Sequence, residues 1–111
     1  MGDKSEFEIK LERQAASTKV SDIMKKCSAF KIGKTGKTLK ERFDEPDYNG
    51  VYTHIDPIFA GTREEVSDME SFLIEKYKHY TKNDNERGGA ASNKDEMAPN
   101  AAEFHVYVVW K

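Results

Sequence analysis

Two features of this sequence have residue types and spacing that suit chemistry on a phosphate. The first is a glycine- and lysine-rich turn at residues 33–38, which follows a short β-prone stretch and precedes Arg42. The second is Glu70, a carboxylate within an expected apolar helix face. A carboxylate can hold Mg²⁺, the metal can polarise a phosphate, and an arginine can offset charge that grows on the phosphoryl group. These are the parts that phosphodiester cleavage uses.

The turn does not match a nucleotide-binding loop. Such a loop needs a glycine five positions before its Gly-Lys-Thr, and Lys31 stands there, so we expect no nucleotide cofactor. Two interpretations remain open. The lysines of the turn are simply solvated, or Lys31, Lys34 and Lys37 contact the phosphates of a nucleic acid. Residues 31–42 favour the second, since they hold five cations against Glu41 alone.

Glu70 also has two interpretations. Its side chain projects into the middle of an apolar stripe at residues 63–80, so it is buried against a cation or serves a site. A structural ion pair, most simply with Arg42, is the plain alternative to metal binding. Spacing alone does not separate the two.

The elements that must position these residues form an α+β domain. We expect a small, mainly antiparallel sheet of three or four strands with about three helices. Strands are predicted at residues 6–12, 29–33, 51–60 and 103–110, with Pro57 marking an edge or a bulge. Helices are predicted at residues 20–27, from Thr38 to the stop at Pro46, and at 63–80. Residues 81–102 read as a long loop.

Length and composition set the frame. The 111 residues suit one domain, and the net charge of −2 does not indicate a nucleic-acid binder on average. No apolar run is long enough for a membrane span or a signal peptide, so we expect no membrane partner and a cytoplasmic location. One cysteine excludes a disulfide scaffold, and with three histidines it makes no cysteine-rich zinc site.

The run Phe30-Lys31-Ile32-Gly33-Lys34-Thr35, with Arg42 nine residues after the glycine and a later helix that carries a glutamate, resembles the GIY-YIG nuclease superfamily. It is similar to phage-type members whose second motif reads Tyr-Lys-Ile-Gly-Lys-Thr. The resemblance covers about residues 29–80. It implies a Mg²⁺-dependent DNA endonuclease in which Gly33 shapes the site, Arg42 binds the scissile phosphate and Glu70 holds the metal.

Two departures from the family pattern concern its tyrosines. The first motif would fall near Val20 and Ser21, where there is no tyrosine, and Lys31 holds the tyrosine position of the second motif. We therefore hypothesise that the terminal stretch 105–109 lies beside 29–33 and brings Tyr107 toward Lys31 and Arg42. Tyr48, Tyr52 and His54 are weaker candidates for the proton-transferring group, and a histidine such as His54 or His79 is more often a surface or packing residue.

The predicted function is thus DNA phosphodiester hydrolysis. Arg42, Glu70, Lys31 and Tyr107 are the expected catalytic residues, and Gly33, Lys34 and Lys37 the expected substrate contacts. The alternatives are a catalytically inactive nucleic-acid-binding or regulatory module on the same scaffold, and an interaction domain with no nucleic-acid role.

Overall fold

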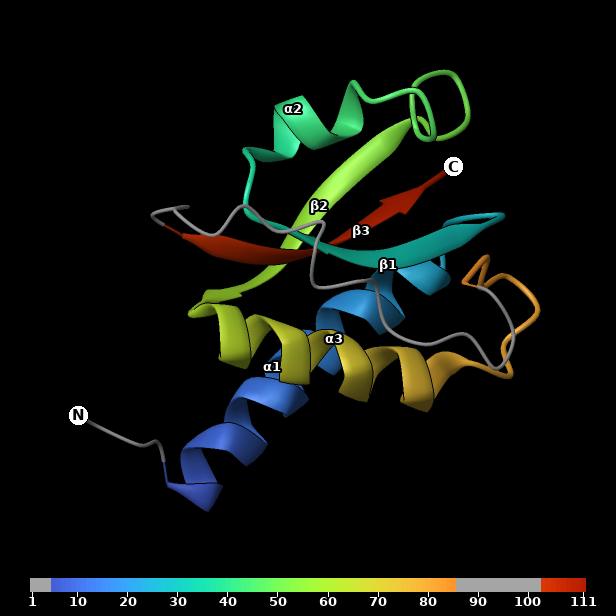
Figure 1. Ribbon diagram of the computed structural model, residues 1–111. Helices are drawn as coiled ribbons and strands as arrows, with labels where there is room; N and C mark the ends of the chain where they lie inside the picture. Colours follow the sequence, from blue (N-terminus) through green and yellow to red (C-terminus); the bar gives the residue numbers. More distant parts are fainter. Residues whose placement is uncertain (1–4, 86–102) are drawn as a thin grey trace.

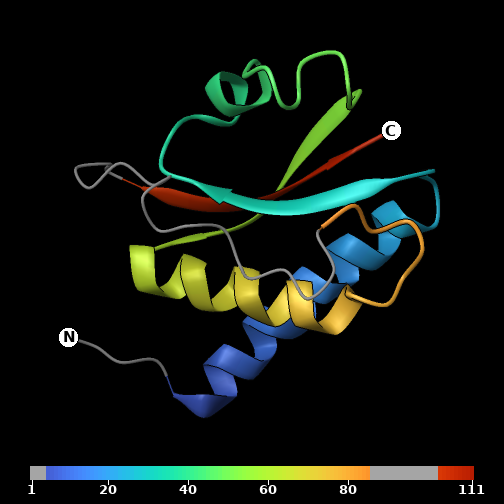
Figure 2. The same cartoon turned by 45° about the vertical axis from the view of Figure 1, so that its right-hand side comes forward.

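The computed structural model describes residues 5–85 and 103–111. It is an α+β fold in which a three-stranded antiparallel sheet separates two helices on one face from a short helix on the other (Figures 1 and 2). The elements in chain order are α1 (Glu6–Met24), β1 (Phe30–Thr35), α2 (Leu39–Phe43), β2 (His54–Gly61), α3 (Arg63–Tyr77) and β3 (Phe104–Trp110). Within the described residues, no helix is long and apolar enough to cross a membrane.

The C-terminal strand β3 occupies the centre of the sheet. The strand order is β1-β3-β2, and β3 runs antiparallel to both neighbours. Its sequence suits this place, because five of its residues are buried and branched or aromatic side chains point to both faces. The hypothesis that this strand lies beside 29–33 is confirmed, with Gly33 opposite Tyr107 in the register.

Each face of the sheet has its own core. Beneath α1 and α3 lies the larger one, into which β1 and β3 send Phe30, Ile32, Val106 and Val108. The smaller core faces α2 and is built around three tyrosines and a valine: Tyr48, Tyr52, Tyr107 and Val109. Side chains alternate between these cores along β1 and β3, as the two-residue period of a strand requires.

The strand predicted at residues 6–12 is wrong. These residues begin α1, which opens with a capping box between Ser5 and Glu8. The alternating apolar residues that suggested a strand stay exposed: Phe7 is 69% and Leu11 47% accessible. The buried face of α1 is instead Ala16, Val20 and Ile23, at helical spacing. Strong helix formers throughout this segment outweigh a chance alternation.

Other boundaries differ in smaller ways. The helix expected to start near Val20 is the last part of α1, which ends at Met24, so Cys27 follows it. Helix α3 ends at Tyr77, and Tyr80 is exposed rather than part of the apolar stripe. Pro57 does lie at an irregularity of the edge strand β2, where the register shifts between Pro57 and Phe59. Helices α2 and α3 begin with capping boxes, at Thr38 and Thr62 respectively.

Candidate functional site

Gly33 makes room for the tyrosine that the C-terminal strand delivers. A Cβ atom at position 33 would lie 2.4 Å from the Tyr107 hydroxyl and 2.5 Å from Cζ. The Tyr107 ring therefore lies over the glycine, in a space that no other residue type leaves open. This contact explains physically why a glycine stands at the end of the Lys-Ile-Gly motif.

The Tyr107 hydroxyl is buried beside two other polar groups. It lies 2.8 Å from the hydroxyl of Tyr48, and it also makes a side-chain hydrogen bond with Arg42. Burial, together with the neighbouring Tyr48, raises the pKa of Tyr107 well above its ordinary value, and Arg42 offsets only part of that effect. Tyr107 is thus a neutral phenol at physiological pH. The hypothesis that β3 brings this tyrosine to Arg42 is confirmed in its geometry.

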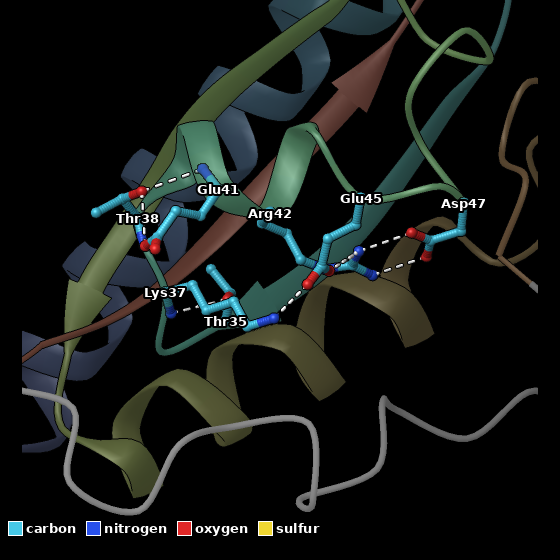
Figure 3. A network of polar contacts seen from close by, with 7 residues as sticks. All are labelled: Thr35, Lys37, Thr38, Glu41, Arg42, Glu45 and Asp47. Atoms are coloured by element: carbon cyan, nitrogen blue, oxygen red, sulfur yellow. Dashed lines mark hydrogen bonds and ion pairs between the residues drawn. The ribbon is translucent and has the colours of Figure 1, made fainter.

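Arg42 is held by acidic residues that follow α2. Its guanidinium donates to both carboxylate oxygens of Asp47 at 2.8 and 3.0 Å and to Glu45 at 2.6 Å, as Figure 3 shows. The guanidinium carbon also lies 4.1 Å from the centroid of the Tyr48 ring. Burial is the largest single influence and lowers the pKa of Arg42, but the hydrogen bond that Arg42 donates to Asp47 and the electrostatic effects of Tyr107, Tyr48 and Asp47 together outweigh it, so the net effect raises this pKa.

The other expected cations have partners as well. Lys37 pairs with Glu45 (Figure 3), and Lys40 pairs with Asp44 at 3.0 Å. The Lys31 ammonium lies 5.7 Å from the Tyr48 ring centroid. Three acidic residues at positions 44, 45 and 47 thus offset most of the positive charge predicted for residues 31–42. The sequence holds this signal, because the acidic residues directly follow the helix. The positive charge predicted for residues 31–42 does not include them.

A second polar cluster lies on the α3 face of the sheet. The Glu70 carboxylate is fully buried, as its place in the apolar stripe predicted. Its Oε1 atom is 3.5 Å from the ammonium of Lys34, which is itself buried, and Lys34 also donates to the Ser67 hydroxyl at 3.3 Å. Lys34 is therefore a buried ion-pair partner and not a solvated lysine.

The structure does not place Glu70 and Arg42 in one facing pair. Gly33 and Lys34 are consecutive residues of β1 and point to opposite faces, the former toward Tyr107 and the latter toward α3. Arg42 belongs to the first side and Glu70 to the second. The ion pair that the sequence allowed between them is not formed, because Lys34 is closer to the carboxylate and Asp47 to the guanidinium. The two clusters instead flank the same end of the edge strand β1.

Asparagines after α3 hold the outer edge of β1, and no strong pattern in the sequence predicts this role. The Asn85 side chain accepts from the Ile32 amide at 3.0 Å and donates to the Ile32 carbonyl at 2.9 Å. Asn83 is buried and donates to the Tyr77 carbonyl. An amide side chain can thus satisfy both groups of an edge residue as a further strand would. The rest of the predicted loop, residues 86–102, lies outside the described residues.

The weaker candidates for proton transfer have other contacts. Tyr52 donates to Asp84 at 2.7 Å, and burial with that hydrogen bond raises its pKa well above the ordinary value. His54 is exposed and stacks on Trp110, and His79 is exposed beyond the end of α3. Of these candidates, Tyr48 makes the hydrogen bond with Tyr107, and Tyr52 packs against Tyr48 in the same core.

Glu70 supplies the donor type that Mg²⁺ prefers. Among residues 5–85 and 103–111 there is no cluster of three or more metal-ligating side chains. Mg²⁺ is commonly bound through one or two carboxylates with water completing its shell, and Glu70 offers one carboxylate, which is fully buried and paired with Lys34. The Lys34 ammonium now neutralises the charge of the Glu70 carboxylate. It has to move away before a metal ion can bind this carboxylate.

Comparisons with family models, with curated proteins and with solved structures find no match for this chain.

Proposed function

We propose that this protein is a small Mg²⁺-dependent endonuclease, similar in design to GIY-YIG nucleases, that hydrolyses DNA phosphodiester bonds. The observation that carries the proposal is the position of Tyr107. The C-terminal strand puts this tyrosine over Gly33 and in contact with Arg42. That is the place in which the family resemblance requires a tyrosine strand, and residues near Val20 do not supply one.

The two clusters divide the work in this proposal. On the α2 face, Arg42 binds the phosphate and stabilises charge that develops on it, while the Tyr48–Tyr107 hydroxyl pair orients the guanidinium and can relay a proton. Glu70 on the α3 face would hold the metal, which would supply Lewis-acid activation of the phosphate. A phosphate that binds at the end of β1 would contact both faces, with Lys31 and Lys37 on its flanking backbone.

Access of the phosphate requires exchange of internal ion pairs. Asp47 and Glu45 accept the hydrogen bonds that Arg42 could otherwise donate to a phosphate, and Lys34 forms an ion pair with Glu70. A DNA phosphate can replace a carboxylate at a guanidinium because both accept two parallel hydrogen bonds. The same exchange breaks the ion pair between Lys34 and Glu70 if the Lys34 ammonium pairs with the phosphate instead.

The test is nicking of supercoiled plasmid by purified variants in the presence of Mg²⁺. Glu70→Gln and Arg42→Gln should each lower the nicking rate at least a hundredfold, whereas Glu64→Gln, an exposed change on the same helix, should leave it unchanged. Circular dichroism confirms that each variant is folded. Undiminished nicking by folded Glu70→Gln protein would refute the metal assignment.

A second candidate function is a nucleic-acid-binding or regulatory module without catalysis. The observation that favours it is that both Arg42 and Glu70 already have ionic partners, since Arg42 pairs with Glu45 and Asp47 and Glu70 pairs with the buried Lys34. This alternative predicts DNA binding that weakens steeply with salt and no magnesium-dependent cleavage. A salt titration of DNA binding beside the plasmid assay separates the two functions.

A further inference from the structure

His54 and Trp110 form an aromatic stack at the surface, where β2 begins and β3 ends. Their ring centroids are 4.0 Å apart, and the ring planes differ by 21°. The two residues are directly opposite each other in the antiparallel register, which brings their side chains together on one face of the sheet. The Trp110 indole donates a hydrogen bond to Asp56 at 2.6 Å, which fixes the orientation of the indole ring. The stack is therefore preorganised.

The outer ring of the stack is open to solvent. His54 is exposed, whereas Trp110 beneath it is half-buried against the larger core. A histidine that only completed a core would be covered on both sides. Here one face of its ring contacts the indole, and its exposed surface is free to take another planar group.

A cation lies beside the stack. The Lys26 ammonium lies 5.0 Å from the centroid of the Trp110 ring, and the Lys26 side chain is exposed. Lys111 follows Trp110 directly, but its ammonium lies 6.0 Å from the Tyr52 ring centroid, on the other face of the sheet. The neighbouring acid, Asp56, accepts a hydrogen bond from the indole. An exposed aromatic ring next to a lysine is the kind of surface on which proteins bind unpaired nucleotides.

We propose that the His54–Trp110 stack binds an unpaired nucleobase, with Lys26 beside a flanking phosphate. The inference deepens the proposed nuclease function and rests on it for the identity of the ligand. Phe30, the other register partner of Trp110, lies four residues from Lys34 on the same strand, which is about 13 Å along β1. A few nucleotides of single-stranded DNA span that distance. The preferred substrate is thus DNA with an unpaired segment next to the cleaved bond.

Trp110 is the only tryptophan of the chain, so its fluorescence reports on this site directly. The full chain is titrated in EDTA with a short oligodeoxythymidylate and, separately, with an abasic oligonucleotide of equal length. The thymidylate should quench the fluorescence saturably, and the abasic strand should bind about tenfold more weakly because it has no base to stack. Anisotropy of the labelled oligonucleotides gives the Kd for variants in which Trp110 fluorescence itself changes.

Three variants separate stacking from other roles. His54→Ala should raise the Kd for the thymidylate about tenfold, and His54→Tyr, which keeps an aromatic ring, should keep it within about twofold. His79→Ala, at the other exposed histidine, is the matched control and should change nothing. The proposal is overturned by equal binding of the thymidylate and abasic strands, by an unchanged Kd in folded His54→Ala protein, or by no binding at all. Because EDTA excludes catalysis, a protein that binds here but does not nick plasmid contradicts only the proposed nuclease function.

Discussion

A methyl group at position 33 tests the contact between Gly33 and Tyr107. In Gly33→Ala the new Cβ would be 2.4 Å from the tyrosine hydroxyl, about 1 Å short of ordinary van der Waals contact. The ring has little freedom to yield, because Tyr107 is 1% exposed and lies against Tyr48 and Arg42. Overpacking of this kind costs about 1–3 kcal/mol, and loss of the Tyr48 hydrogen bond adds about 1 kcal/mol. We expect Gly33→Ala to lower the free energy of unfolding by about 2–4 kcal/mol.

The assay is urea unfolding followed by circular dichroism, with a double-mutant cycle. Tyr107→Leu removes the ring atoms that the methyl group meets, so Gly33→Ala in that background should cost less than about 1 kcal/mol. The melting temperature of the single Gly33→Ala variant should be roughly 10 °C below that of the wild type. Equal costs in the two backgrounds, or no cost in either, would refute the packing that the structure assigns to this motif.

Three further outcomes follow from contacts at the site and its edges. Asn85→Ala should lower the free energy of unfolding by about 1–2 kcal/mol, since it removes both hydrogen bonds to the edge residue Ile32; a loss below about 0.3 kcal/mol would contradict this. Arg42 lowers the pKa of Asp47, so their pair stabilises the fold above the unfolded pKa near 4 and loses that effect as pH falls further; the stability gap between wild type and Asp47→Asn should shrink below about pH 4, and a constant gap would count against the pair. Burial raises the pKa of the Cys27 thiol, so a disulfide reagent should modify it slowly in native protein at pH 8 and rapidly in urea; equal rates would show that the thiol is accessible.

Local patterns in the sequence predicted most elements because they have local causes. The capping boxes at Thr38 and Thr62 are formed by residues three apart, and the apolar stripe of α3 needs only helical spacing. The same helical spacing predicts that Glu70 is buried, without any information on its contacts. The error at residues 6–12 arose because alternation is a weak signal when the alternating residues are not buried. Long-range packing, not the local pattern, decides which face of such a segment is covered.

The contacts of the candidate site were harder to predict because they cross the sheet. Which cation pairs with Glu70 depends on the strand parity of β1, which sends Lys34 to the α3 face and leaves Gly33 under Tyr107. Arg42 lies on the other face of the sheet, where it forms ion pairs with nearby acidic residues. The position of Tyr107 was within reach of sequence reasoning, since a β-prone terminal stretch can replace a strand that the chain lacks elsewhere.

The nuclease proposal is tested most directly by wild-type protein on supercoiled plasmid, with Mg²⁺ and with EDTA in parallel reactions. The account predicts that nicked circles accumulate only when the metal is present and that Glu70→Gln protein produces none. Intact supercoiled DNA after prolonged incubation of folded wild-type protein with Mg²⁺ would contradict it.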